Sequence, residues 1–196
     1  MKEIVFASGN RHKVEEAQKI FGPKYKILTP ADLGFDGDIP ETHETIQENS
    51  EEKARFVWEK FSKPCFSDDT GLEVDALGGE PGVYSARYAG EAKLPGRNIE
   101  KLLGKMKDVA DADRTARFRC VVSYIDGDGR LTQFEGRCEG SIAREPIPGG
   151  GFGYDPVFVP EGYDCVMASL TMEQKNAISH RGKAMEALID FLGKSL

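Results

Sequence analysis

The chain lacks the long apolar runs that mark secreted and membrane-spanning proteins. The opening segment MKEIVFASGN has only about five apolar residues before polar ones follow, which is too few for the core of a signal peptide or for a membrane span. We therefore expect a cytoplasmic protein that does not contact a membrane.

Paired cysteines are also missing. The chain has four cysteines, Cys65, Cys120, Cys138 and Cys165, but no C-x-x-C spacing. Three of them lie in or beside apolar, strand-like runs, so we expect buried, reduced thiols. A zinc site normally needs ligands in closely spaced pairs, and this pattern argues against one.

The chain also lacks an excess of positive charge. The formal net charge is -7 and the isoelectric point is about 5.1. Proteins that bind nucleic-acid polymers draw most of their affinity from clustered lysine and arginine. We therefore expect no nucleic-acid polymer as a partner, and any anionic ligand must be held by local features.

Two common nucleotide-binding motifs are absent as well. The glycine run 149–153 does not fit G-x-G-x-x-G and does not open a helix after a strand. The segment GKS at 193–195 has Leu188 where a P-loop needs glycine. A nucleotide must therefore be bound in another way.

The remaining pattern is that of an α/β protein with one core. With 196 residues, of which 39% are apolar, the chain can bury one sizeable core. Strands are predicted at 3–8 and 25–28, around a helix that Gly22-Pro23 ends. A capping box at Thr45 predicts a helix to about Phe61. Further predictions are a helix at 98–106, a hairpin of strands 116–125 and 131–142, and helices after Thr171 and Ser179.

The segment SGNRHK is the first candidate site. It follows a strand and opens a helix, where free backbone amides and the helix dipole favour an anion such as phosphate. The plain alternative is an Asn10 cap with a surface lysine. The candidate residues are Ser8, Gly9, Asn10, Arg11, His12 and Lys13.

A polar pair on the predicted 45–61 helix is the second candidate. Asn49 and Lys53 are four residues apart and lie on the side of the helix that carries Ile46. They border the apolar stripe, which is unusual for pure packing. A solvated helix face remains the alternative, and nearby Glu41 can be an ordinary loop acid.

The segment CFSDDTGL is the third candidate. We interpret Asp68 and Asp69 as lying at the end of a buried strand, before a Thr70-Gly71 turn. Mg²⁺ takes one or two protein carboxylates and completes its shell with water and phosphate oxygens. A carboxylate can also deprotonate a water. Adjacent strand residues face opposite sides, so we expect the two acids to differ in role. An Asx turn is the alternative.

The glycine-dense segment GGGFGYD and the downstream segment KNAISHRGKA form the fourth candidate. The glycines leave room for Phe152 and Tyr154 to stack on a planar ring. Lys175, His180 and Arg181 then supply donors suited to a carbonyl oxygen on a purine, which the amino group of adenine does not match. Surface residues near a helix start are the alternative.

Together these segments resemble the inosine/xanthosine triphosphate pyrophosphatase family, which hydrolyses non-standard purine nucleoside triphosphates to monophosphate and pyrophosphate. The resemblance spans nearly the whole chain in the family's order. Its segments are SGNRHK at 8–13, ETHETIQENSEEKA at 41–54, SDDTGLEVDALGGEPGVYSARYAG at 67–90, GGFGYDPVF at 150–158 and SHRGKA at 179–184. His43 and Ser50 depart from the family's usual glycine and alanine.

The resemblance implies a role for each matched residue. Glu41 and Asp69 would hold Mg²⁺, Asp69 would also accept a proton from the attacking water, and Asp68 would support the metal's waters. The residues implied to contact phosphate are Ser8, Gly9, Asn10, Arg11, His12, Lys13, Asn49 and Lys53. Thr70 would contact the substrate. The residues implied to contact base and sugar are Phe152, Gly153, Tyr154, Asp155, Lys175, His180 and Arg181.

The resemblance also implies an elongated α/β fold. It predicts one catalytic domain, 1–196, with two lobes around a long mixed sheet, a cleft between the lobes, and a homodimer. We therefore predict an Mg²⁺-dependent pyrophosphatase acting on ITP, dITP and XTP, which would cleanse the nucleotide pool. A nucleotide-binding regulator without turnover is the main alternative. A purely structural module is a third, but it leaves Lys13, Lys53, Lys175 and Arg181 unexplained as a set.

Overall fold

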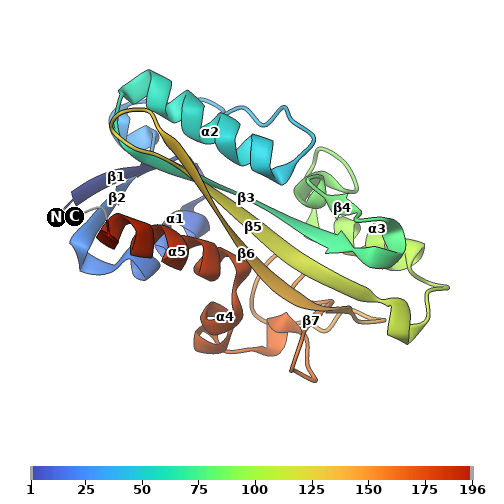
Figure 1. The fold of residues 1–196 in the computed structure, drawn as a ribbon. Coiled ribbons are helices and arrows are strands. Elements are labelled where there is room, and N and C mark those ends of the chain that lie inside the picture. Colours follow the sequence, from blue (N-terminus) through green and yellow to red (C-terminus); the bar gives the residue numbers. More distant parts are fainter. Residues whose placement is uncertain (1, 195–196) are drawn as a thin grey trace. The chain divides into compact units, whose positions relative to one another are not determined.

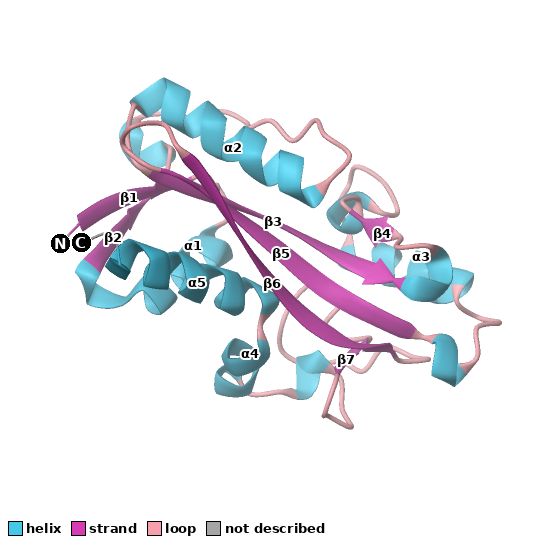
Figure 2. Cartoon of the chain, viewed as in Figure 1, coloured by secondary structure: helices cyan, strands magenta, loops and turns pink. Residues whose placement is uncertain are grey.

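The computed structural model describes residues 2–194, which form twelve regular helices and strands joined by turns and short 3-10 segments. Figure 1 traces them in chain order and Figure 2 separates helices from strands. The strands are β1 Lys2–Phe6, β2 Tyr25–Leu28, β3 Cys65–Val74, β4 Pro81–Gly82, β5 Thr115–Ile125, β6 Leu131–Ile142 and β7 Phe158–Pro160. The helices are α1 Arg11–Phe21, α2 Ile46–Phe61, α3 Pro95–Lys105, α4 Met172–Ile178 and α5 His180–Lys194.

The strands form one mixed sheet. Its order is β2-β1-β3-β5-β6-β7, with β4 paired to β3. Strand β1 runs parallel to β2 and β3, whereas β4 is antiparallel to β3 and β7 is antiparallel to β6. Strands β5 and β6 are neighbours joined by residues 126–130, as the predicted hairpin requires. The predicted mixed sheet with flanking helices is confirmed.

Helix ends agree closely with the sequence signals. The Asn10 side chain caps α1, and Gly22 with φ 64° ends it. The Thr45 hydroxyl accepts the amide of Glu48 at the start of α2 and also donates to the carboxylate of Glu48. Helix α4 begins with a complete capping box at Thr171. These caps depend on residues close in sequence, which is why they can be predicted.

The chain divides into two compact units. Unit 1 comprises Met1–Asp69, Cys120–Gly136 and Arg181–Leu196, and unit 2 comprises Thr70–Arg119 and Arg137–His180. Strands β3, β5 and β6 contribute residues to both units. Each unit has its own apolar core.

Unit 1 has helices on both faces of its part of the sheet. Alternate residues of β1 face opposite sides: Ile4 and Phe6 pack with α1 and α5, whereas Val5, together with Ala7 just after the strand, packs with α2. The same alternation continues in β3, where Phe66 faces α1 and α5. Figure 1 shows α2 on one side of these strands and α1 with α5 on the other.

Unit 2 packs one apolar cluster and exposes a charged sheet face. Helix α3 contributes Ile99 and Leu102 to that cluster. The opposite face of β5 carries Arg117, which bonds Asp75 on one side and Glu139 on the other. Cross-strand charged pairs of this kind stabilise a solvent-exposed sheet face without forming an apolar patch.

The position of the two central acids within the strand differs from the prediction. Asp68 and Asp69 lie in the middle of β3, not at its end, and Thr70-Gly71 is extended strand, not a turn. The backbone stays extended because Leu72 and Val74, beyond the polar residues, are fully buried in unit 2. The two carboxylates are therefore set by a rigid element.

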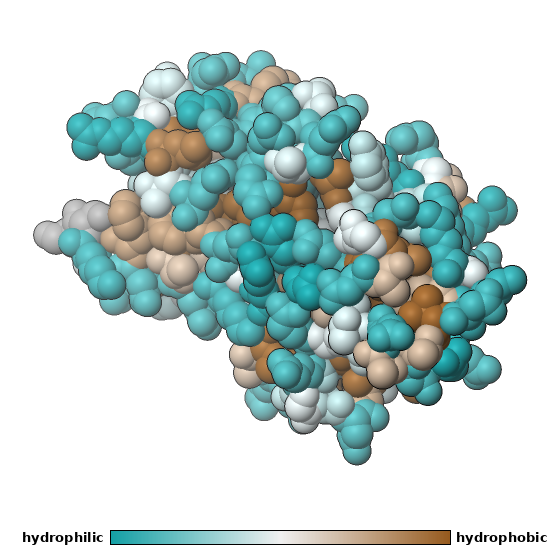
Figure 3. All heavy atoms as spheres, turned by 45° about the vertical axis from the view of Figure 1, so that its right-hand side comes forward, coloured by the Kyte–Doolittle hydropathy of each residue, from teal (hydrophilic) through white to brown (hydrophobic). Residues whose placement is uncertain are grey.

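The surface and the thiols agree with the composition. Figure 3 shows a mostly hydrophilic face with separate apolar patches. All four cysteines are reduced thiols, with Cys65, Cys120 and Cys138 buried and Cys165 half-buried. Within residues 2–194, no helix combines the length and apolarity needed to cross a membrane.

Candidate active site in unit 1

Asp68 and Asp69 point to opposite faces of β3, as their adjacency predicts. Asp68 shares a face with Phe66, and its Oδ1 and Oδ2 atoms accept from Lys13 Nζ at 3.0 Å and Arg181 Nε at 2.9 Å. Asp69 faces α2, where its Oδ1 accepts from Lys53 Nζ at 3.1 Å. The two acids therefore meet different cations, and the prediction that they face opposite sides is confirmed, whereas their separate roles stay a prediction.

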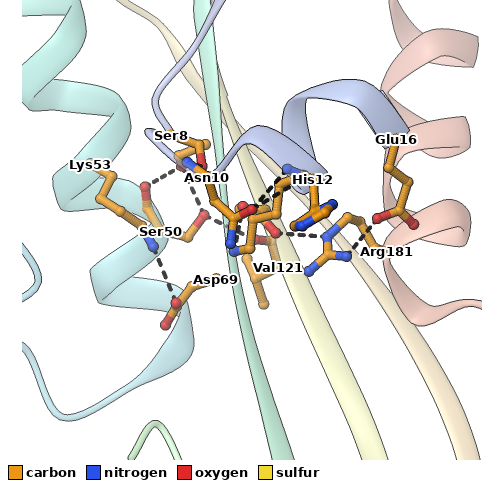
Figure 4. Close-up of polar contacts among 12 residues, drawn as sticks. Ser8, Asn10, His12, Glu16, Ser50, Lys53, Asp69, Val121 and Arg181 are labelled. Carbon is orange, nitrogen blue, oxygen red and sulfur yellow. Dashed lines mark hydrogen bonds and ion pairs between the residues drawn. The ribbon is translucent and has the colours of Figure 1, made fainter. Parts of the chain in front are cut away.

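The α2 side of the site gathers two carboxylates around one ammonium group. Lys53 Nζ lies 2.6 Å from Glu41 Oε1 as well as 3.1 Å from Asp69 Oδ1, and the lysine is only 5% exposed. Figure 4 shows Lys53 and Asp69 directed at each other. Residues 28 positions apart in sequence thus converge on one point.

The protonation equilibria reflect an excess of negative charge at this point. Burial, reinforced by Glu41, raises the pKa of Asp69 although Lys53 opposes it. Burial lowers the pKa of Lys53, but Asp69, Asp68 and Glu41 outweigh that effect and raise it overall. Both directions follow from two carboxylates that share one positive charge.

This donor set fits a hard divalent cation. Among residues 2–194, no three His, Cys, Asp or Glu side chains gather into a group that would enclose a metal. Two convergent carboxylates suit Mg²⁺, which takes its remaining ligands from water and phosphate oxygens. Glu41 and Asp69 are the two residues that would hold it.

On the opposite face of β3, neighbouring cations balance the negative charge of Asp68. Burial by itself raises the pKa of Asp68, but Lys13 and Arg181 together hold that pKa well below its ordinary value. Arg181 also donates from Nη1 to Glu16 Oε2 at 2.7 Å. The Arg181 guanidinium, predicted to contact a base, is thus engaged with two carboxylates in unit 1, and its base contact stays a prediction.

Side chains of α2 fasten the segment that carries Glu41. Glu52 accepts from the amide and the hydroxyl of Thr42 at 2.8 and 2.7 Å. Asn49 accepts from the His43 amide at 2.9 Å and donates to the His43 carbonyl at 3.1 Å. Both ends of the Asn49 amide therefore position this loop. The predicted phosphate contact of Asn49 remains a prediction, and the role of Glu52 was missed.

The SGNRHK segment is capped within the chain. The amides of His12 and Lys13 donate to Asn10 Oδ1 at 3.0 and 3.3 Å, and the Asn10 amide donates to Ser8 Oγ at 3.2 Å. The cap in the alternative interpretation is therefore confirmed, and these two amides are not free. The surface lysine in that interpretation is not, because Lys13 is half-buried and bonds Asp68. A side chain at Gly9 would meet no atom within 4 Å, so the space above this glycine is open.

A buried serine pair joins α2 to the middle strands, and no sequence pattern predicted it. Ser50 Oγ donates to the carbonyl of Val121 at 3.0 Å and lies 3.0 Å from Ser67 Oγ. Ser67 in turn donates to the carbonyl of Ser50. These bonds fix the helix turn that carries Lys53 against the strand that carries Asp69.

Except for Arg181, which belongs to unit 1, the residues expected near a base lie in unit 2, and they differ in exposure. Phe152 is 62% exposed, whereas Tyr154 is 4% exposed and donates its hydroxyl to the Ser85 carbonyl at 2.8 Å. The expectation that both aromatic rings offer a stacking face is thus wrong for Tyr154, whose ring belongs to the core. Gly153 adopts φ 63°, which favours glycine at this turn.

The glycine loop is held by a half-buried ion pair. Lys175 Nζ donates to the Gly150 carbonyl at 2.6 Å and lies 3.5 Å from Asp155 Oδ2, which also accepts from the Phe152 amide at 3.3 Å. A Cβ on Gly151 would collide with Asp155 and Lys175. Lys175, Asp155 and Phe152 are thus brought together as the sequence suggested.

Two further predicted residues lie elsewhere in unit 2. His180 stacks on Phe118 with ring centroids 4.9 Å apart and planes 12° apart. The hydroxyl of Thr70 is buried and has no hydrogen-bond partner among the described residues. Its predicted substrate contact remains a prediction.

Comparisons with known proteins agree with this architecture. The family model described as the Ham1 family matches residues 4–191. The chain is 46% identical to the dITP/XTP pyrophosphatase of Flavobacterium psychrophilum over 189 residues, which cover 96% of this chain and 98% of that protein. It is also 46% identical to the dITP/XTP pyrophosphatase of Bacillus subtilis, with 98% of both chains covered.

Comparison with solved structures agrees with the comparison of sequences. The Staphylococcus aureus Ham1 protein matches with a TM-score of 0.92 and 44% identity, and all of both chains is covered. A HAM1 protein from Coxiella burnetii matches with a TM-score of 0.91 and 38% identity over 99% of this chain and 100% of that chain. These matches confirm the resemblance found in the sequence: the chain belongs to the Ham1 family.

Proposed function

We propose that this chain hydrolyses the non-canonical purine nucleoside triphosphates ITP, dITP and XTP to the nucleoside monophosphate and pyrophosphate, with Mg²⁺ as cofactor. The observation that carries the proposal is the convergence of Glu41 and Asp69 on Lys53. The names of its relatives, dITP/XTP pyrophosphatase, support the substrate class. The biological role that follows is the cleansing of the nucleotide pool.

The phosphates would meet the cations of unit 1. Lys13 is 20% exposed at its side chain and can exchange the Asp68 carboxylate for a phosphate oxygen. Lys53 stands beside the proposed metal ligands. A chain with a net charge of -7 needs such local positive charge to accept a triphosphate. Ser8 to His12 and Asn49 complete the proposed phosphate contacts.

Asp69 is the proposed proton acceptor for the attacking water. Its carboxylate converges with that of Glu41, the other proposed metal ligand, so it can accept a proton from a water held at that point. When bound, Mg²⁺ supplies charge neutralisation and polarises phosphoryl oxygens. Asp68 would orient the water network from the other face of the strand.

The residues that the sequence places near the base are proposed to select it. The exposed ring of Phe152 offers a stacking face. Lys175, His180 and Arg181 would donate to the 6-oxo group, and Thr70, Gly153, Tyr154 and Asp155 would shape the surroundings of the base and sugar. Adenine presents an amino group at that position, and we expect donors to discriminate against it.

The assembly and location are proposals of the same kind. We propose one catalytic domain, 1–196, that forms a homodimer in the cytoplasm. Sedimentation of the purified protein tests the dimer: a mass near twice 21.6 kDa supports it, and a mass of one chain overturns it.

The function is tested by product identification. The purified protein is incubated with dITP, XTP, dGTP and dATP, with Mg²⁺ or with EDTA, and the phosphorus products are separated. We expect pyrophosphate from dITP and XTP with Mg²⁺, and at least tenfold slower release from dATP. Orthophosphate as the product, or tight binding without turnover, would refute the proposal and favour another hydrolase or the nucleotide-binding regulator.

A further inference from the structure

Four charged side chains form a chain of alternating sign on the α1 and α5 side of β3. The order is Lys13, Asp68, Arg181, Glu16, with contacts of 3.0 Å, 2.9 Å and 2.7 Å between successive groups. Figure 4 shows Glu16 and Arg181 directed at each other. The inner pair is buried, whereas the Lys13 and Glu16 side chains are 20% and 26% exposed.

The local structure explains why α1 supplies both ends of this chain. Lys13 and Glu16 are three residues apart and therefore share one helix face. The face is directed at β3, because Ala17 and Phe21 of the same helix pack in the core with Phe66. Neighbouring Glu15 points away and pairs with Arg11, whose side chain is 90% exposed. Adjacent glutamates of one helix thus have different environments.

Glu16 fixes the plane of the Arg181 guanidinium. Arg181 donates from Nε to Asp68 and from Nη1 to Glu16, so two of its edges are fixed by different carboxylates. A guanidinium held by one carboxylate can still turn, whereas two separate anchors define its orientation. Because Arg181 binds Asp68 Oδ2, its orientation also sets that of Oδ1, the atom that meets Lys13.

We propose that Glu16 is a positioning residue for the pyrophosphatase reaction. Glu16 acts through Arg181 and Asp68 to hold Lys13 where Lys13 meets the phosphates. When Lys13 turns to a phosphate, Arg181 still balances the negative charge of Asp68 and keeps its carboxylate in place. This inference rests on the proposed function. It assigns to a helix residue outside the proposed substrate and metal contacts control over the geometry of one of those contacts.

Three variants separate positioning from simple charge. Glu16→Gln keeps the shape but removes the charge, and Glu16→Asp keeps the charge but withdraws the carboxylate from Arg181. Glu15→Gln is the matched control, because it removes the same charge one residue away from an exposed pair. All three are assayed for kcat and KM with XTP, and their thermal unfolding is measured alongside.

We expect both Glu16 variants to lower kcat by about tenfold or more, since small misplacements of reacting groups cost that much. KM should stay within about threefold and Glu15→Gln should resemble the wild type. Equal effects of Glu15→Gln and Glu16→Gln, or a wild-type rate in Glu16→Asp, would show that only the field of the charge matters and would overturn the proposal. A loss confined to KM would do the same.

A second readout does not depend on turnover. With arginine labelled at ¹⁵Nε, we expect the Nε–H resonance of Arg181, assigned by its loss in Arg181→Lys, to exchange slowly with solvent in the wild type. Exchange should be at least tenfold faster in Glu16→Gln and unchanged in Glu15→Gln. Unchanged exchange in Glu16→Gln would overturn the positioning role. If wild-type protein released no pyrophosphate, the proposed function alone would fail, and this measurement would still test the anchor.

Discussion

Replacing Asp68 with asparagine should destabilise the fold far more than the same change at Asp69. Asp68→Asn leaves two cations beside a neutral amide. Removal of one partner from a buried ion pair costs about 3 to 5 kcal/mol. Lys13 is 20% exposed and can turn to water, and Arg181 keeps Glu16, so we expect the low end of that range. For a chain of this size, about 3 kcal/mol lowers Tm by about 6 to 12 °C.

The pH dependence of this difference has a definite sign. The folded-state pKa of Asp68 is lowered, so its contribution is fully present above the ordinary value of 3.8 and is lost as the pH falls through the folded-state pKa. The gap in Tm between wild type and Asp68→Asn should therefore be complete at pH 7. It should narrow only in acid below pH 3.8.

Asp69→Asn provides the matched control. The pKa of Asp69 is raised, which means that its ionised form slightly disfavours folding, while its loss leaves Lys53 with Glu41. We expect its Tm to stay within about 3 °C of the wild type, or about 1 kcal/mol. Calorimetric unfolding of the three proteins measures this. Equal Tm values for wild type and Asp68→Asn, or a larger loss in Asp69→Asn, would contradict the charge balance described for β3.

Three further outcomes follow from the structure. Asp69→Asn should lose about 10²- to 10⁴-fold in kcat while it stays folded, measured by pyrophosphate release, and wild-type rates would refute its role as the base. Gly140→Ala should lower the free energy of unfolding, measured in urea, by about 1 to 3 kcal/mol, because the new Cβ would collide with Val159 and Phe158. Gly104→Ala is the control: its Cβ would meet no atom within 4 Å, so its free energy of unfolding should be unchanged or higher. Phe152→Leu should raise KM for XTP about five- to tenfold through lost stacking, of about 1 kcal/mol or more, and an unchanged KM would show that its ring does not contact the base.

Much of the fold could be predicted because its signals are local. The ends of α1 and α2 depend on Asn10, Gly22 and Thr45, which act on backbone groups within a few residues. The hairpin of β5 and β6 depends on two long strand-like segments and the short turn DGDG between them. The opposite orientation of Asp68 and Asp69 follows from strand geometry alone.

The features that the sequence predicted wrongly depend on contacts between residues distant in sequence. The segment around Thr70-Gly71 resembles a turn in composition, but burial of Leu72 and Val74 keeps it extended. Tyr154 stands among glycines that suggest an open loop, yet the Ser85 carbonyl, 69 residues away, accepts its hydroxyl in the core. No local pattern shows that a ring will find such a partner.

Two residues of the site could not be predicted for a similar reason. Glu16 and Glu52 look like ordinary acids of amphipathic helices. Their roles appear only when α5 brings Arg181 to α1 and when the loop at Thr42 folds over α2. The metal-binding hypothesis, in contrast, could be formed from the sequence because it depends on side-chain chemistry and on the family resemblance.

The central claim is that Glu41 and Asp69, from two distant segments, hold one divalent cation that the reaction requires. The most direct measurement is the rate of pyrophosphate release from XTP across a titration with Mg²⁺, in the wild type and in Glu41→Gln. We expect Glu41→Gln to need at least about tenfold more Mg²⁺ for half-maximal rate, since one of two carboxylate ligands is lost. An identical Mg²⁺ dependence in the two proteins, or full activity of the wild type in EDTA, would contradict it.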